Sequence, residues 1–103
     1  MNPKVWKQKA LEFTDRLELL TKNEIQTQKE EILNTSKKLA YEGWGQIDSK
    51  TYDAFYLIYV DIVCTYIYFA ALLPKMFYKC DMQKKKQLIL EFRKYCINEK
   101  GEY

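Results

Sequence analysis

The longest apolar stretch of the chain covers residues 49–73, with the sequence SKTYDAFYLIYVDIVCTYIYFAALL. Aromatic and β-branched residues dominate it, and Asp61 is its only charged residue after position 53. These residue types favour strands, but about 25 residues without a turn signal exceed the usual length of a strand. We therefore predict a helix over residues 49–73 that ends at Pro74, because proline lacks a backbone N–H and disfavours helical geometry in the residue before it.

A helical wheel at about 100° per residue gives this predicted helix an aromatic face. That face consists of Tyr52, Tyr56, Tyr59, Val63, Tyr66 and Ala70. A neighbouring face consists of Phe55, Ile58, Ile62, Phe69 and Leu73, and the remaining face carries Leu57, Asp61, Cys64, Thr65 and Tyr68. Each tyrosine joins a large apolar ring to a hydroxyl that needs a partner or water. Two interpretations therefore stay open for the tyrosines: a protein–protein interface, or an ordinary core with hydroxyls at its rim. The candidate interface residues are Tyr52, Tyr56, Tyr59 and Tyr66.

The apolar residues 54–73 are also numerous enough to cross a hydrocarbon layer. An Asp near the centre of such a segment costs about 2.5 to 3.5 kcal/mol on the insertion scale, which makes insertion marginal. We therefore favour a central helix that neighbouring helices surround, and keep a segment at or in the bilayer as the alternative. Asp61 is then a candidate buried polar group, paired with a lysine of another helix or hydrogen-bonded to a tyrosine hydroxyl.

Amphipathic patterns predict three further helices, over residues 3–20, 22–42 and 82–98. In the first of them the apolar residues recur at spacings of four and three: Trp6, Ala10, Phe13, Leu17 and Leu20. Thr21 and Glu24 form a capping-box pattern, so we favour a break or bend there over one long helix. Gly43, Gly45 and the N-cap residue Asp48 mark the clearest break in the chain. Residues 98–103 have nothing to bury and are expected to fray.

The composition predicts one domain over residues 1–103. The chain has 103 residues, of which 48% are hydrophobic, and it contains only 3 Gly and 2 Pro. Disordered and turn-rich β proteins have a different composition. Short polar links between long periodic segments favour antiparallel packing of neighbours. The predicted fold is all-α: a small bundle of three to four antiparallel helices around a very apolar, Tyr-rich central helix.

The residue types argue against an enzyme. The chain has no His, which removes the commonest general base and the commonest transition-metal ligand. Its 3 Cys residues form no C-x-x-C pair, and Cys64 lies in the apolar run, where we expect a small buried hydrophobe. No phosphate-binding glycine loop or nucleophile motif occurs. We therefore expect no catalytic site, no metal and no cofactor, and a reducing, cytoplasmic location.

The charged residues do not predict a nucleic-acid-binding protein. The net charge is only +3, and Arg, the residue best suited to base and phosphate recognition, occurs only at Arg16 and Arg93. Lys84, Lys85 and Lys86 are candidates for contact with an anion. We favour a solvated helix face as their ordinary role.

The leading hypothesis is a small non-enzymatic protein that binds another protein, itself or both. A phage- or mobile-element-encoded inhibitor and a bacteriocin-type immunity protein are examples of this class. The alternative is a membrane-associated protein with residues 54–73 at or in the bilayer. A weaker alternative is a nucleic-acid-associated accessory protein that uses the lysines.

Overall fold

The computed structural model describes residues 2–69 and 82–97, and within them all regular structure is helical. The all-α prediction is therefore confirmed. The elements, in chain order, are α1 (Pro3–Leu19), α2 (Lys22–Thr27), α3 (Lys29–Gly43), α4 (Ser49–Ile58), the π-helical segment η1 (Tyr59–Phe69) and α5 (Met82–Cys96). The expected end of a helix at Pro74 and the expected fraying of residues 98–103 lie outside the described residues.

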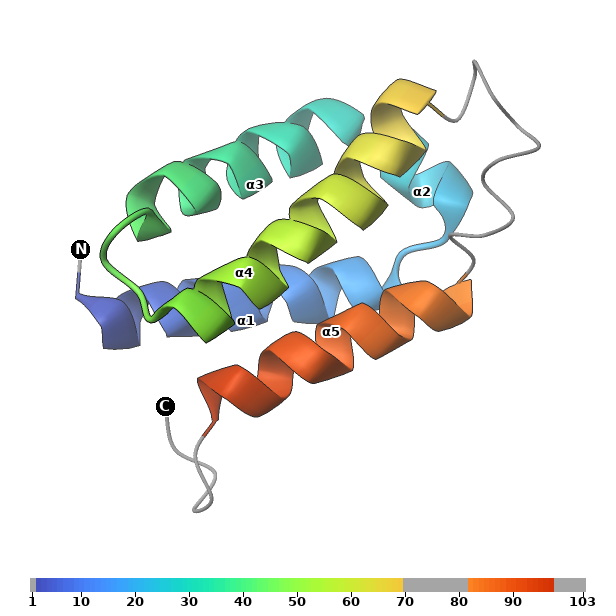
Figure 1. Ribbon diagram of the computed structural model, residues 1–103. Helices are drawn as coiled ribbons and strands as arrows, with labels where there is room; N and C mark the ends of the chain where they lie inside the picture. Colours follow the sequence, from blue (N-terminus) through green and yellow to red (C-terminus); the bar gives the residue numbers. More distant parts are fainter. Residues whose placement is uncertain (1, 70–81, 98–103) are drawn as a thin grey trace.

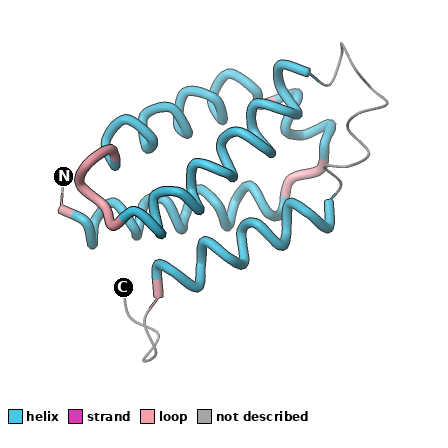
Figure 2. The backbone as a smooth tube through the Cα atoms, viewed as in Figure 1, coloured by secondary structure: helices cyan, strands magenta, loops and turns pink. Residues whose placement is uncertain are grey.

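The helices form two antiparallel pairs that share one core (Figures 1 and 2). α1 and the α4–η1 segment run in one direction, and α3 and α5 run in the opposite direction (Figure 1). α5 packs against α4 and α1, while α3 packs against α1 and η1. The short helix α2 lies against η1. The α4–η1 segment therefore has α3 on one side and α5 on the other.

Local capping interactions determine where the helices begin. The Asn2 side chain accepts a 2.8 Å hydrogen bond from the backbone N–H of Lys4 at the start of α1. Thr21 and Glu24 form a reciprocal capping box at the start of α2, after the extended backbone of Leu20 ends α1. The chain thus breaks where the capping-box pattern stands. The predicted helix 22–42 is itself divided at Gln28, between α2 and α3.

Trp6 joins four helices in the core. Its ring is fully buried and meets Phe55 and Phe92 edge-on, with ring centroids 5.3 and 6.1 Å away. Its Nε1 donates a 2.8 Å hydrogen bond to the carbonyl oxygen of Leu39, which ties α1 to α3. The tryptophan therefore meets its polar requirement inside an apolar core. The same core continues along the bundle with aliphatic residues from every described helix, among them Leu17, Ile25, Ile32, Ile58, Ile62 and Ile89.

Gly43 is required by this tryptophan. A Cβ at position 43 would lie 2.8 Å from Cε2 and Nε1 of Trp6, closer than real contacts allow. Gly43→Ala is expected to lower the free energy of unfolding by about 1 to 3 kcal/mol, because overpacking in a filled core outweighs the gain in helix propensity. Chemical denaturation measures the change. Gly45→Ala is the control: Gly45 has open space around it and a positive φ of 72°, so it should lose only about 1 kcal/mol of backbone strain. A Gly43→Ala variant as stable as the wild type would contradict the close approach.

The structure corrects two details of the predicted helix 49–73. From Tyr59 to Phe69 it is a π-helix, whose i→i+5 hydrogen bonds place one more residue in each turn. Val63, expected on the tyrosine face, consequently joins Ile62 in the core, and both are fully buried. The segment is also not enclosed on most of its circumference, because Tyr56 and Leu57 are about half exposed. Residues 70–73 of the prediction lie outside the described residues.

Candidate interaction surface

Four aromatic rings follow one another along one side of α4. Trp44 meets Tyr52 edge-on at 5.7 Å between ring centroids. Tyr52 stacks on Tyr56 at 6.2 Å, and Tyr56 meets Tyr59 in a tilted contact at 5.9 Å. We call these four residues, together with the neighbouring Tyr41, the aromatic surface. The structure thus brings together three of the four predicted interface tyrosines, while the side chain of Tyr66 is outside what it describes.

The turn between α3 and α4 positions the first two rings. Gly45 adopts its positive φ in this turn, a conformation that side-chain-bearing residues rarely adopt. Asp48 then caps α4 by accepting hydrogen bonds from the backbone N–H and the hydroxyl of Thr51, at 3.1 and 2.7 Å. The Tyr52 hydroxyl donates a 2.9 Å hydrogen bond to the carbonyl oxygen of Ala40, so its ring bridges α4 and α3. The rings are therefore attached to helices that the core already holds in place.

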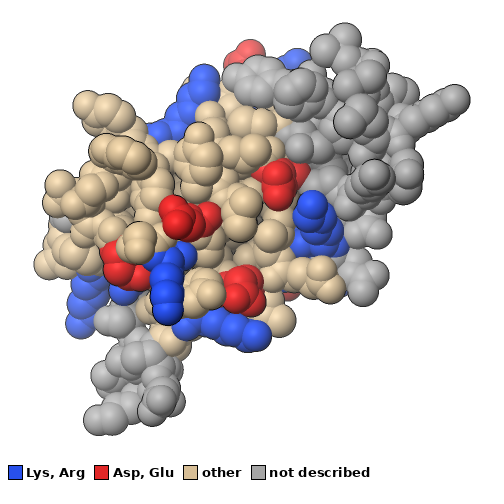
Figure 3. Space-filling view, viewed as in Figure 1, with Lys and Arg blue, Asp and Glu red and all other residues tan. Residues whose placement is uncertain are grey.

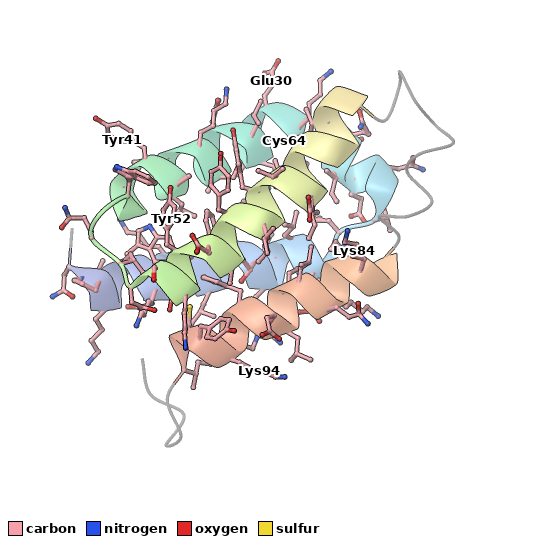
Figure 4. All side chains as sticks on the ribbon, in the orientation of Figure 1. Glu30, Tyr41, Tyr52, Cys64, Lys84 and Lys94 are labelled. Carbon is pink, nitrogen blue, oxygen red and sulfur yellow. The ribbon has the colours of Figure 1, made fainter. Side chains whose placement is uncertain are left out.

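Much of this aromatic area faces solvent. Tyr41 is 85% exposed, Trp44 is 72% exposed and Tyr56 is 47% exposed. Figure 3 shows a largely uncharged area over the end of α3 and the turn that follows it, with acidic and basic side chains beside it over the start of α4. Figure 4 shows Tyr41 and Tyr52 in this region. Contiguous exposed aromatic area of this kind is typical of an interaction site on a protein surface.

Sequence reasoning missed Tyr41 and Trp44. Both precede the tyrosine-rich helix and belong to the end of α3 and the turn that follows it. The one local signal was Trp44 itself, a bulky aromatic residue between Gly43 and Gly45. That signal shows a turn but does not show which surface the indole ring joins.

Asp61 forms an ion pair with Lys84 of α5, with 3.9 Å between the carboxylate oxygen and Nζ. The predicted pairing with a lysine of another helix is confirmed, whereas the prediction of a buried polar group is wrong, because the Asp61 side chain is 35% exposed. The π-helical turn places Asp61 near the edge that faces α5, because the core side of η1 is occupied by Ile62 and Val63. The pair links η1 to α5, and as a partly exposed pair it contributes little to stability.

Lys85 is buried. The prediction that it shares a solvated helix face with Lys84 and Lys86 is therefore wrong. Its side chain is fully buried, whereas Lys86 is exposed. The Lys85 Nζ donates hydrogen bonds to the carbonyl oxygens of Leu17, at 2.8 Å, and Leu20. Both carbonyls lie at the end of α1, where the regular backbone hydrogen bonds of the helix stop, and that of Leu17 also accepts a 3.2 Å hydrogen bond from the backbone N–H of Leu20. Burial lowers the pKa of the Lys85 ammonium, while Glu18 and Glu24 raise it.

The three lysines therefore do not form one anion-binding patch. Lys84 pairs with Asp61, Lys85 is bonded to the end of α1, and Lys86 stands in solvent. Because Lys85 cannot reach an external phosphate without breaking its two hydrogen bonds, the predicted triplet is reduced to two separated cations.

The cysteines carry no reactive site among the described residues. Burial raises the pKa of the Cys96 thiol to about 12, which keeps it protonated and unreactive. Cys64, expected to be fully buried, is half-buried beside Tyr59, and burial raises its thiol pKa as well. Cys80 lies outside the described residues. No three His, Cys, Asp or Glu side chains gather as metal ligands in residues 2–69 and 82–97.

The described helices include none that combines the length and the apolar character needed to span a bilayer. The predicted membrane segment 54–73 extends past the described part of the chain. Comparison of the chain with protein-family models, with curated proteins and with solved structures finds no match.

Proposed function

We propose that this chain is a small non-enzymatic protein that acts by binding another protein through the aromatic surface. The observation that carries the proposal is the continuous row of four ring contacts from Trp44 to Tyr59, with Trp44 and Tyr56 largely open to solvent. Trp and Tyr are the residues most enriched at the energetic centres of protein interfaces. They supply large contact areas and lose few rotamers when a partner binds.

The proposal treats the chain as one domain with four antiparallel helical segments: α1, α3, α4 with η1, and α5. The tyrosine-rich α4–η1 segment lies between α3 and α5 and presents its rings to the partner. Tyr52 supports this role, because its hydroxyl is bonded to Ala40 and its ring is held between Trp44 and Tyr56. Pre-ordered side chains lower the entropy cost of binding.

The wider biological role belongs to the same proposal. A cytoplasmic inhibitor encoded by a phage or mobile element, or a bacteriocin-type immunity protein, would need one rigid surface and no chemistry of its own. The absence of His from the chain supports a binding role over a catalytic one. The partner's surface should be apolar at its centre, because the rings of the aromatic surface carry no charge.

A photoreactive cross-linking residue at position 56 tests the proposal. The variant is produced in the cells that normally express the protein and is then irradiated. We expect a covalent adduct with a protein, because Tyr56 lies in the middle of the aromatic surface. The control carries the same residue at position 90, where Leu90 is 51% exposed, close to the 47% of Tyr56.

Leu90 lies on α5, away from the aromatic surface. A protein adduct at position 56 and none at position 90 is the expected result. Equal adducts at both positions would show non-specific collision. No adduct at position 56 would contradict the proposal.

A further inference from the structure

We propose that the groove between α4 and α5 binds a basic helix of a partner protein. In this complex a Lys or Arg of the partner lies between the carboxylates of Asp53 and Glu91, and an aliphatic side chain one turn away packs on Leu57. The inference goes beyond the proposed function and does not rest on it. The aromatic surface lies on the α3 side of α4, where Tyr52 bonds Ala40, whereas the groove lies on the α5 side.

The groove is a cavity of about 350 Å³ along the contact between the two helices. Its walls include Lys50, Asp53 and Leu57 of α4 and Leu88, Glu91 and Tyr95 of α5. On each helix these residues are three and four positions apart, so they share one face. The Thr51 hydroxyl is 3.4 Å from the carbonyl oxygen of Tyr95, which places the start of α4 beside the end of α5.

One end of the groove is apolar. α4 and α5 run in opposite directions, so Leu57, late in α4, faces Leu88, early in α5 (Figure 1). Leu57 is 48% exposed and can therefore be covered by a ligand. One turn beyond these two leucines, the Asp61–Lys84 ion pair joins η1 to α5. The carboxylate at that point is thus already paired with a lysine of this chain.

The other end of the groove is acidic. Asp53 and Glu91 are both exposed, and neither forms an ion pair with a described lysine or arginine. Glu91 accepts a hydrogen bond from the neutral Tyr95 hydroxyl and raises its pKa. Lys50 is the only cation among the described residues that line the groove, so a net negative charge remains. Figure 3 shows acidic side chains over both α4 and α5, with an uncharged area between them.

This acidic end selects a basic ligand. The chain as a whole carries a net charge of +3, so its overall field repels cations, and attraction of a basic ligand has to come from a local group of carboxylates. Lys and Arg also have long apolar stems that pack on apolar surface while the charged end reaches a carboxylate. The groove offers both kinds of contact, with Leu57 one turn from Asp53 on the same face of α4.

The exposure of the groove walls favours a helix over a small molecule. Small-molecule sites bury about 70 to 90% of the ligand surface, whereas Leu57 and Tyr95, on opposite walls, are themselves 48% and 42% exposed. A ligand here is covered on one side only, as an amphipathic helix is in a groove. Asp53 and Leu57 are four residues apart, about 6 Å along α4. A basic and an aliphatic residue four positions apart on the partner helix match that spacing.

Titration of the isotope-labelled full chain with two helical peptides, followed by NMR, tests the inference. Both peptides are built from Ala and Gln. The first carries one Arg and one Leu four positions apart, and the second has Glu in place of the Arg. With the Arg peptide we expect saturable shifts of the amides of residues 50–57 and 88–95. The Glu peptide should bind at least about tenfold more weakly, because repulsion replaces attraction at both carboxylates.

Neutral substitutions show which charges hold the peptide. Asp53→Asn combined with Glu91→Gln should weaken binding of the Arg peptide by about five- to tenfold, whereas Lys50→Gln should strengthen it by about twofold. Glu30→Gln is the matched control, because Glu30 is exposed on α3 and forms no ion pair with a described residue (Figure 4). It should leave binding unchanged. Equal losses in the control and the double variant would show long-range attraction alone and would overturn the inference.

Charge reversal gives the sharpest version of the test. Asp53→Lys combined with Glu91→Lys should make the Glu peptide bind more tightly than the Arg peptide, because both contacts change sign. The spectrum of the free variant shows whether it is folded, since both positions are on the surface. A reversed variant that still prefers the Arg peptide would overturn the inference.

Two further outcomes would also overturn it. The first is the absence of saturable shifts at millimolar concentrations of the Arg peptide. The second is a set of shifts confined to the aromatic surface and lost in Tyr56→Ala, because the Arg would then bind the rings through cation–π contacts. Neither outcome decides the proposed function, which depends on the adduct at position 56. A peptide bound in the groove without any adduct at position 56 would support this inference and contradict the proposed function.

Discussion

Trp6→Ala should lower the free energy of unfolding by about 3 to 5 kcal/mol, the range for removing a large aromatic side chain from a core. Trp6 is fully buried, contacts Phe55 and Phe92, and bonds the carbonyl oxygen of Leu39. For a domain of 103 residues this is a large share of the total stability. Urea denaturation followed by circular dichroism measures the loss. A loss below about 1 kcal/mol would contradict the close packing of the Trp6 side chain in the core.

The contact between Trp6 and Gly43 allows a sharper version of this test. Trp6→Phe removes the indole atoms that face Gly43, and with them the hydrogen bond to Leu39. The cost of Gly43→Ala should therefore be smaller in the Trp6→Phe background than in the wild type. A double-mutant cycle measures this difference as a coupling energy, expected at about 0.5 to 3 kcal/mol for residues in contact. Additive effects would show that the alanine Cβ is accommodated elsewhere.

Lys85→Ala should lower the free energy of unfolding by about 2 to 4 kcal/mol. The substitution leaves a cavity, removes one of two donors from the carbonyl oxygen of Leu17 and removes the Lys85 donor from that of Leu20. Lys85→Met keeps most of the volume and removes only the donor, so its loss should be smaller, about 1 to 3 kcal/mol. Lys86→Ala, at an exposed position of the same helix, is the control and should change little.

The pH dependence of stability provides a second measure of Lys85. Burial lowers its pKa in the folded protein below the ordinary value of 10.5. At pH values between the pKa of Lys85 in the folded protein and its ordinary value, the unfolded chain binds more protons than the folded one. Lys85 therefore makes the free energy of unfolding rise with pH in that range. Lys85→Met should abolish that rise. The comparison is made between variant and wild type, because the raised pKa values of Tyr52 and Tyr95 act in the opposite direction in both proteins. Identical pH profiles would contradict a buried ammonium group.

Local sequence patterns were sufficient to predict the helices and several of their ends. The apolar residues of α1 recur with the period of a helix, and five of those predicted for its face are buried: Trp6, Ala10, Phe13, Leu17 and Leu20. The capping residues Thr21 and Asp48 act on backbone groups only three positions away. These interactions depend on residues close in sequence, and they can be recognised without knowledge of the fold.

Two features of the structure, the burial of Lys85 and the place of Val63, could not be predicted from local sequence patterns. Lys85 is buried because α5 places it at the end of α1, where two carbonyl oxygens accept its hydrogen bonds across more than sixty residues of sequence. Its neighbours Lys84 and Lys86 are also lysines but lie in different environments. Composition alone therefore could not show which of the three lysines is buried. The π-helical turns of η1 moved Val63 from the tyrosine face into the core, which a wheel with a fixed helical period could not show.

Residue type and spacing along the chain determined the helical class of the fold, the scarcity of catalytic side chains and the aromatic character of the α4–η1 segment. The tertiary structure decided which of its rings are exposed, that Tyr41 and Trp44 join them, and which lysine is buried. The physical reason is that helix formation and capping are governed by contacts within about four residues. Exposure and ion pairing depend on which other helix covers a given face, and that is established only when the core around Trp6 and Phe55 is assembled.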